Sequence, residues 1–283
     1  MKPSKKPAVH NENEKISFFH YIDDTCEIEI HFHDSYEIFQ ACTDNVRYYV
    51  EGNAYDLKKG DVIITNQKEI HRPSTVDKSP YNRRYVQFKP DIFTPFFDTG
   101  YNPLRIFSTR NLGFGNFIPV SQLANQKVTK LFDDIESLSG LSDQKSVVLT
   151  NTLLIQLFIE LDTLYQSINP SLEYSLSTDP RIMPVIEYLS CDFVQPFSLE
   201  KLSNDFFIDK YYLSHLFKEN TGFTLYEYVQ LKRIQKAKTL IQAGEVISKV
   251  STDCGFMDYS NFYKTFKKLV QMSPSAYKKI LKL

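Results

Sequence analysis

The chain contains the stretch Phe207-Ile-Asp-Lys-Tyr-Tyr-Leu-Ser-His-Leu-Phe-Lys218 and repeats its pattern 49 residues later in Phe256-Met-Asp-Tyr-Ser-Asn-Phe-Tyr-Lys-Thr-Phe-Lys267. In both copies an aspartate is followed by apolar residues four and eight positions later, which predicts a capped helix with one buried face. A shift of 48 residues also superposes the apolar positions of 199–202 on those of 247–250. Each copy therefore predicts a short helix, a tight turn and a second helix, the outline of a helix-turn-helix whose second helix enters the DNA major groove.

Capping signals predict where the helices around this repeat begin. We expect one helix to be capped by Asp179 with Pro180 at its first position. The other predicted starts are Ser198, Asp209, the capping box Thr224-Leu-Tyr-Glu227, Asp258 and Ser273-Pro274. Residues 179–283 are thus predicted to be all-α, with helix-turn-helix units at about 198–219 and 247–270 and a long connecting helix near 224–242. A helical bundle with a duplicated hairpin is the alternative.

The charge distribution favours an anionic partner for this end of the chain. The whole sequence has a formal net charge of −1. Residues 179–283 contain 15 Lys and Arg against 11 Asp and Glu, whereas the preceding residues contain 18 against 23. A basic C-terminal third beside an acidic remainder hints at an anionic partner for one end of the chain, and a solvated surface of mixed charge is the alternative.

The repeated third resembles the DNA-binding domain of the AraC/XylS transcription regulators. The resemblance rests on Leu213-Ser-His-Leu-Phe-Lys218, Thr221-Gly222, Tyr228, Arg233, Ala237, Leu240, Cys254-Gly-Phe-Met-Asp258, Ser260, Phe262, Phe266-Lys-Lys268, Ser273-Pro274 and Tyr277. It implies seven helices with two helix-turn-helix units and a function as a sequence-specific transcription regulator, not an enzyme. The implied partners are an operator in double-stranded DNA, a small-molecule effector and, for an activator, RNA polymerase.

The resemblance also implies which side chains contact DNA. On the first recognition helix they are Lys210, Tyr211, Ser214, His215 and Lys218, and on the second Tyr259, Ser260, Asn261, Tyr263, Lys264 and Lys267. Asparagine can pair bidentately with adenine, and lysine can reach guanine or a phosphate. The chain departs from the family pattern at Ser203 and Ser251, which replace Ala, at Val246, which replaces a capping Ser or Thr, and at Gln271, which replaces Gly.

Residues 16–117 predict β-structure. The run Cys26–His33 alternates apolar and polar residues with a period of two. The runs 46–50, 62–64 and 84–88 are rich in β-branched and aromatic residues and are separated by turn signals. Many short strands at this spacing predict an antiparallel barrel or sandwich.

Two helices, at about 121–139 and 143–167, are predicted to follow, joined by a turn at Gly140. The second has a wide apolar stripe formed by Leu154, Leu157, Phe158, Leu161, Leu164 and Tyr165. The stripe either packs on its own barrel or forms a dimer interface. We assign 16–168 to an effector-binding and dimerisation domain and expect a homodimer.

Two polar segments flank this domain. Residues 1–15 are predicted to be a disordered arm, and 169–178, which lack periodicity, are predicted to be a linker. The predicted fold class is therefore α+β multidomain, with a β-barrel and two helices followed by an all-α domain.

The spacing of His31, His33 and Glu37, followed by His71, resembles the two cupin motifs found in the sensor domains of many AraC-type regulators. This resemblance implies a cupin-like barrel whose effector site includes His31, His33, Glu37 and His71. Aromatic residues, among them Tyr36 and Tyr85, are expected to line it, and the family makes a sugar the expected effector.

Three imidazoles and a carboxylate would also suit a divalent transition metal, which leaves a cupin-type metalloenzyme fused to a DNA-binding domain as the alternative. The chain departs from the metal-binding pattern in several places. Thr25 and Asp44 replace glycines, and Asn66 and Lys68 replace the Pro and Gly before His71. We therefore expect no cofactor.

Cysteine spacing and hydropathy exclude other classes. The four cysteines form no CxxC pair, which argues against a zinc finger or a disulfide framework and suits a reducing compartment. The first 15 residues contain no apolar stretch, so no signal peptide is expected. The longest apolar run, 153–161, is interrupted by Gln156 and Glu160, so we expect no membrane span and a cytoplasmic location.

Overall fold

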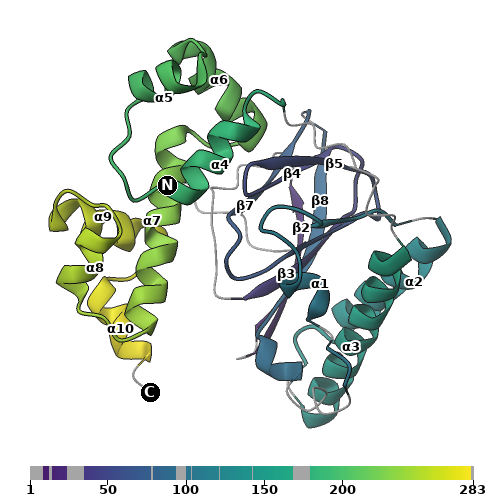
Figure 1. The fold of residues 1–283 in the computed structure, drawn as a ribbon. Helices are drawn as coiled ribbons and strands as arrows, with labels where there is room; N and C mark the ends of the chain where they lie inside the picture. The colour runs from purple at the N-terminus through teal and green to yellow at the C-terminus, as the bar shows by residue number, and fades with distance from the viewer. Residues whose placement is uncertain are drawn as a thin grey trace. The chain divides into compact units, whose positions relative to one another are not determined.

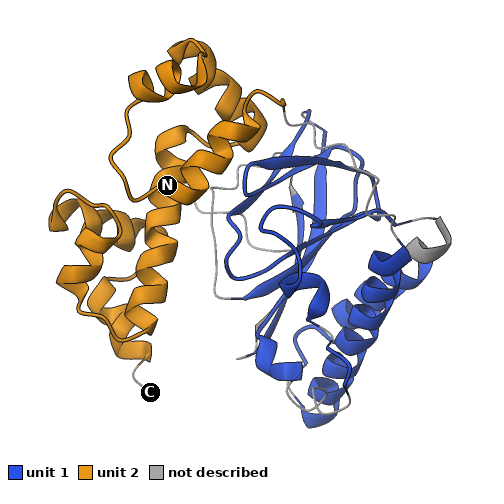
Figure 2. Ribbon diagram, in the orientation of Figure 1, with its two compact units in different colours: residues 1–177 blue, residues 178–283 orange. Residues whose placement is uncertain are grey.

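The β-rich and helical parts of the sequence form separate units in the computed structural model, which describes residues 9–12, 15–23, 35–77, 79–93, 100–102, 104–120, 122–141, 143–167 and 179–281. Unit 1 comprises residues 1–177 and unit 2 residues 178–283 (Figure 2). Among the described residues, unit 1 contains strands and three helices and unit 2 contains helices only (Figure 1). The predicted α+β class is thereby confirmed.

Unit 1 contains two antiparallel sheets. The larger has the strand order β1-β2-β8-β3-β6-β9, and the smaller has the order β5-β4-β7. The strands are β1 Val9–Glu12, β2 Ile16–Asp23, β3 Tyr36–Ala41, β4 Val46–Val50, β5 Asn53–Leu57, β6 Val62–Thr65, β7 His71–Thr75, β8 Tyr81–Phe88 and β9 Phe117–Ile118.

Both faces of the larger sheet are buried. Neighbouring residues of a strand point to opposite sides, so each strand contributes side chains to both faces. On β3, Ile38 belongs to an apolar cluster with the helices of unit 1, whereas Phe39 belongs to a second cluster with the smaller sheet. Val86 on β8 lies in the first cluster and Tyr85 at the edge of the second. The second cluster is the interior between the two sheets.

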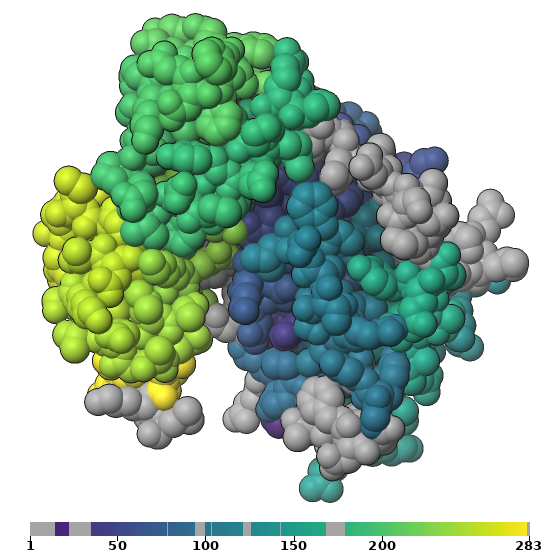
Figure 3. Space-filling model, viewed as in Figure 1, coloured from purple at the N-terminus to yellow at the C-terminus, as the bar shows by residue number. Residues whose placement is uncertain are grey.

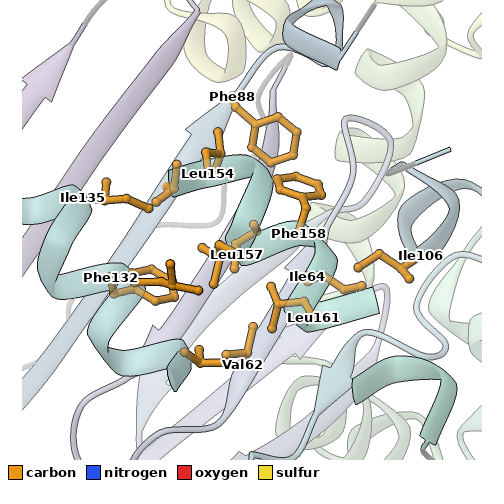
Figure 4. Close-up of a cluster of buried hydrophobic side chains, with 14 of the residues drawn as sticks. Val62, Ile64, Phe88, Ile106, Phe132, Ile135, Leu154, Leu157, Phe158 and Leu161 are labelled. Carbon is orange, nitrogen blue, oxygen red and sulfur yellow. The ribbon is translucent and has the colours of Figure 1, made fainter. Parts of the chain in front are cut away.

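Helices cover the first face of the larger sheet. They are α1 Arg105–Ser108, α2 Gln122–Ser137 and α3 Gln144–Ser167. Figure 4 shows side chains of α2 and α3 interdigitating with residues of β6 and β8. Leu154, Leu157, Phe158 and Leu161 are fully buried there. The apolar stripe of α3 therefore packs within its own unit, which is the first of the two alternatives that the sequence left open.

Helix α3 is the one described helix that is long and apolar enough to cross a membrane. A core helix of a soluble protein passes the same test. A third of its apolar window is buried inside unit 1 by the packing just described.

Part of the N-terminal arm forms a strand. Residues Val9–Glu12, which we predicted to be disordered, form β1 and pair with Ser17–His20 of β2. Backbone hydrogen bonds at a sheet edge require no apolar side chains, so hydropathy alone does not predict such a strand. The predicted strand Cys26–His33 lies outside the described residues.

Unit 2 consists of α4 Met183–Asp192, α5 Leu199–Phe206, α6 Lys210–Thr221, α7 Leu225–Gln242, α8 Ile247–Asp253, α9 Tyr259–Val270 and α10 Pro274–Leu281. The caps predicted at Ser198, Asp209 and Asp258 are confirmed, since each side chain accepts a hydrogen bond from a first-turn backbone N–H. The capping box of Thr224 and Glu227 is also confirmed.

The predicted cap at Asp179 is wrong. Helix α4 begins at Met183 with Pro184 in its first turn, and Asp179 instead accepts a hydrogen bond from the Arg181 backbone N–H. Of the departures from the family pattern, Val246 precedes α8 without a side-chain cap. Gln271 takes the glycine-like conformation with φ of 60° at the end of α9.

Candidate nucleic-acid interface and barrel interior

The recognition helices α6 and α9 are each held by an apolar face turned toward the rest of unit 2. On α6 the buried residues include Leu213 and Phe217, and on α9 they are Phe262 and Phe266. These are the positions that the 49-residue repeat aligns. In the space-filling view, the green first helix-turn-helix and the yellow second one form two lobes of unit 2 (Figure 3).

The opposite faces of α6 and α9 expose the residues predicted to contact DNA. Ten of them are exposed, and Lys210 is partly buried. The tyrosines Tyr211, Tyr259 and Tyr263 have exposed fractions of 75%, 47% and 36%, so they are surface rather than core residues. The exposed set is Tyr211, Ser214, His215, Lys218, Tyr259, Ser260, Asn261, Tyr263, Lys264 and Lys267.

Several of these residues also contact other side chains of unit 2. Asn261 Oδ1 accepts a hydrogen bond of 3.3 Å from the Thr265 hydroxyl, and the ring centres of Tyr259 and Tyr263 lie 6.4 Å apart. The Lys210 ammonium lies 3.8 Å from a Glu200 carboxylate oxygen and 5.2 Å from the centre of the Tyr211 ring. His215 Nδ1 lies 3.5 Å from Glu219, one turn further along α6. Over the ranges that the structure describes, the remaining lysines of the set form no ion pair, so their charges face solvent.

Sequence analysis missed exposed residues beside the second recognition helix. Met257, with an exposed fraction of 88%, precedes α9, and Lys268 is exposed near its end. The repeat aligns Met257 with Ile208, and Lys268 was already part of the family resemblance, so both carried a usable signal. A methionine at this place can contact a thymine methyl group.

In the interior of unit 1, a buried carboxylate joins the two sheets. Glu37 on β3 accepts a hydrogen bond of 2.8 Å from the Tyr48 hydroxyl on β4 of the smaller sheet. Its other oxygen accepts from the Gln87 amide on β8 at 3.0 Å. Burial first, and then the Glu37 carboxylate, raise the pKa of Tyr48 well above its usual value, so its hydroxyl remains a donor.

His71 extends this group from β7. Its Nδ1 lies 2.9 Å from the Glu69 carbonyl oxygen, which can only accept, so Nδ1 holds the proton. Its Nε2 lies 3.9 Å from Glu37, and its ring stacks on Tyr48 at 6.1 Å. Thr65, paired with Glu37 across β3 and β6, has a buried hydroxyl oxygen without a hydrogen-bond partner in the described part of the chain.

The structure brings together some of the predicted effector residues and separates one. Glu37 and His71 lie 3.9 Å apart. Tyr85, on the same face as Glu37, stacks on Phe19 at 4.7 Å, and burial followed by Glu37 raises its pKa. Tyr36 lies on the opposite face of the sheet, against Phe88 in the helix-facing cluster.

Two residues of the predicted set, His31 and His33, lie outside the described residues. Within those residues no group of three or more His, Cys, Asp and Glu side chains is arranged to hold a metal ion. The two oxygens of Glu37 already accept hydrogen bonds from Tyr48 and Gln87. The metal interpretation therefore stays a prediction that depends on His31 and His33.

A second buried carboxylate anchors the segment before β9 to the barrel. Glu69 accepts hydrogen bonds from both terminal nitrogens of Arg110, from Gly113 N at 2.9 Å and from Asn66 N at 3.0 Å. Asn116 Nδ2 adds a contact of 3.1 Å. Burial alone would raise the pKa of Glu69, but Arg110 and the backbone N–H groups of Gly113 and Asn66 together lower it.

A β-rich unit with buried polar groups in an apolar interior, followed by paired helix-turn-helix units with exposed recognition helices, is typical of a ligand-responsive DNA-binding regulator. The family model described as "AraC-like ligand binding domain" matches residues 16–158, and that described as "Helix-turn-helix domain" matches 202–280. The chain belongs to the AraC family of transcription regulators, which confirms the resemblance found in the sequence.

Relatives of this chain are transcription regulators. The transcriptional activator RhaS of Escherichia fergusonii is 25% identical over 246 residues, which are 86% of this chain and 85% of RhaS. The regulator YijO of Escherichia coli is 31% identical over 94 residues, 33% of each chain. Regulators of Staphylococcus aureus are 24% identical over 81% of this chain, which spans 29% of their length. Among solved structures, an apo variant of ToxT from Vibrio cholerae is 16% identical over 96% of this chain and all of its own, with a TM-score of 0.43.

Proposed function

We propose that this regulator binds a specific operator through α6 and α9 and changes its activity when a carbohydrate or a related metabolite binds inside unit 1. The observation that supports the DNA part most strongly is the pair of capped recognition helices with exposed Asn, Ser, Tyr and Lys side chains. These residue types supply both base-reading and phosphate contacts.

The proposed DNA contacts are the predicted residues of α6 and α9. Because both helices pack on the continuous α7, they enter successive major grooves on one DNA face, about 34 Å apart. Footprinting the full chain on a duplex selected from a random-sequence pool tests this. Two protected grooves in phase are expected, and protection of a single groove would contradict it.

The carbohydrate assignment is supported by the chemistry of the interior. Sugars present hydroxyl groups in a ring plane, and a buried carboxylate, an amide and aromatic side chains can bind them by hydrogen bonds and stacking. Glu37, Gln87, Thr65 and Tyr85 offer these groups on one face of the larger sheet. A ligand bound in this interior would replace the hydrogen bonds that Glu37 makes within the protein by hydrogen bonds to the ligand.

Thermal shift of the full chain against a panel of monosaccharides and sugar acids tests the effector class. A binder should raise the Tm of unit 1 in the wild type, and Glu37→Gln should reduce the shift. The matched control is Glu136→Gln, which removes a carboxylate from the other face of the same sheet, where it contacts His20. Equal shifts in the wild type and Glu37→Gln would remove this residue from the site.

We further propose that α3 forms a homodimer through its outward face. Val148 and Ile159 have exposed fractions of 62% and 48%, and Thr152 and Ile155 lie between them on the same side of the helix. Sedimentation of the wild type at micromolar concentration should give a dimer, and Val148→Glu should give a folded monomer. Association of the wild type with detergent or vesicles instead of itself would contradict the dimer.

Operating on DNA requires a cytoplasmic location, and RNA polymerase is a further partner if the chain activates transcription. The relatives are regulators rather than enzymes. The metalloenzyme alternative is tested by measuring metal in the purified chain. Stoichiometric zinc, iron or manganese that is lost in His31→Ala and His33→Ala would favour that alternative.

A further inference from the structure

The segment between α4 and α5, residues 193–197, lies at a junction of unit 2. It leads from the end of α4 to Ser198, the cap of α5 in the first helix-turn-helix unit. Its Pro196 and Phe197 line a hollow of about 450 Å³ together with Ser214 of α6 and Met257 before α9. One short segment therefore adjoins both helix-turn-helix units.

Arg233, in the middle of the connecting helix α7, holds this segment. Its Nε donates a hydrogen bond of 2.8 Å to the Phe193 carbonyl oxygen, and its Nη2 donates one of 3.1 Å to the Gln195 carbonyl oxygen. The guanidinium lies 5.8 Å from the centre of the Phe256 ring, in the turn of the second unit. Arg233 is 8% exposed, and burial lowers its pKa.

The second helix-turn-helix contacts the same segment directly at Gly255. A Cβ atom at this position would lie 2.1 Å from the Val194 carbonyl oxygen and 2.9 Å from Val194 Cα. Gly255 also has a φ of +82°, a conformation that side chains disfavour. The backbone of the α8–α9 turn can therefore approach the 193–197 segment only with glycine here.

These contacts give the two helix-turn-helix units a second connection besides α7. The first helix-turn-helix packs on α7 through α6, and the second helix-turn-helix packs on α7 through α8 and α9 (Figure 1). Joined by a single helix, two units can twist about its axis by small changes spread along the helix. A second attachment, away from that axis, removes this freedom and fixes the angle between α6 and α9.

We propose that Arg233, with the 193–197 segment and Gly255, forms a bracket that sets the spacing between DNA half-sites. Arg233 is a positioning residue: it acts through the carbonyl groups of Phe193 and Gln195. One base pair more or less between the half-sites moves the second half-site by about 3.4 Å and turns it by roughly 35°. A rigid pair of recognition helices cannot follow that change, whereas a pair joined only by α7 can follow part of it.

This proposal rests on the proposed DNA recognition. The test uses the full chain. It begins with a duplex that the wild type selects from a random-sequence pool. Derivatives of this duplex have one base pair inserted or removed between the two footprinted half-sites, or one half-site scrambled. Kd is measured at fixed salt for the wild type, Arg233→Lys, Arg233→Gln and the control Lys236→Gln. Lysine retains the charge but cannot form the two divergent hydrogen bonds of a planar guanidinium. Lys236→Gln removes one charge from the next turn of α7.

The wild type and Lys236→Gln should lose roughly tenfold or more in affinity on either change of spacing, because the base contacts of one helix are lost. Both Arg233 variants should lose only about two- to threefold, and should bind the duplex with one intact half-site as the wild type does. An unchanged spacing penalty in the Arg233 variants would overturn the proposal.

Two other outcomes also count against the bracket. If Arg233→Lys keeps the wild-type penalty while Arg233→Gln loses it, charge rather than the fork of hydrogen bonds is responsible. If both variants lose affinity for the duplex with a single half-site, Arg233 stabilises the fold of one helix-turn-helix and does not set the spacing between the two. Failure to select any specific duplex would instead contradict the proposed function, so the two failures are distinguishable.

Discussion

Removing the guanidinium that neutralises Glu69 should destabilise unit 1 far more than removing an arginine from its surface. The Glu69 side chain is fully buried, and Arg110 donates to both of its oxygens. Arg110→Met leaves that carboxylate buried with neutral donors only. Breaking a buried ion pair in this way costs about 3–5 kcal/mol. For a unit of 177 residues this corresponds to a Tm lower by about 6–20 °C.

The free energy of unfolding should also depend on pH in opposite directions in the wild type and in Arg110→Met. In the wild type the pKa of Glu69 is lowered, so its contribution to stability is present above the unfolded-state pKa and is lost as pH falls through the folded-state pKa. In Arg110→Met burial acts without the counter-charge and raises that pKa. The variant therefore recovers stability as pH falls and the carboxyl is protonated. The cost of the substitution at pH 5 should be smaller than at pH 7.5 by about 1 kcal/mol or more.

The assay is denaturant and thermal unfolding of the full chain at both pH values, with two further variants. Arg47→Met is the matched control, since Arg47 makes an exposed bidentate pair with Asp56 at 2.6 and 2.8 Å, and it should cost about 0–1 kcal/mol. Adding Glu69→Gln to Arg110→Met removes the buried charge and should abolish the pH dependence. A cost for Arg110→Met below about 1 kcal/mol, or one equal at both pH values, would refute the reasoning.

Three further expectations follow from unit 2 and from α3. Asn261→Ala should relax base choice at one operator position by about 1–3 kcal/mol, whereas Lys267→Ala should weaken all duplexes alike and lower the salt slope by about one, both measured by titration at several salt concentrations. Leu157→Ala should lower the free energy of unfolding by about 2–5 kcal/mol without changing the sedimentation of the folded fraction, because this side chain is buried within its own unit. Gln271→Gly should stabilise unit 2 by about 0.5–1 kcal/mol in chemical denaturation, because Gln271 occupies the left-handed region at φ of 60°.

The DNA-binding unit was predictable from sequence because its signals are local. The caps at Ser198, Asp209, Thr224 and Asp258 each combine a side chain with backbone groups two or three residues away. The repeat supplies the cap at Asp209 a second time at Asp258, although Val246, which aligns with Ser198, has no side-chain cap. Asp179 shows the limit, since a cap-like residue followed by proline here binds Arg181 while the helix begins four residues later.

The interior of unit 1 was less predictable because its contacts join distant strands. Glu37 on β3 accepts hydrogen bonds from Tyr48 and Gln87, which lie 11 and 50 residues away along the chain. Its neighbour Tyr36 faces the helices because side chains alternate along a strand. The pair of Glu69 and Arg110 is separated by 41 residues and has no local pattern. The same holds for Arg233, whose carbonyl partners lie 38 and 40 residues before it.

The separate cores of the two units limit how an effector can act. Binding shifts an equilibrium only through different affinities for two states, so an effector in unit 1 must favour a state that differs in unit 1 or at its surface. The angle between α6 and α9 is set inside unit 2, by α7 and by the proposed bracket. The effector is therefore expected to change how many copies of unit 2 are held together, and not the shape of each copy. The proposed dimerisation through α3 would make binding of the second half of an operator intramolecular, which can raise affinity by about 10²–10⁴ without a new DNA contact.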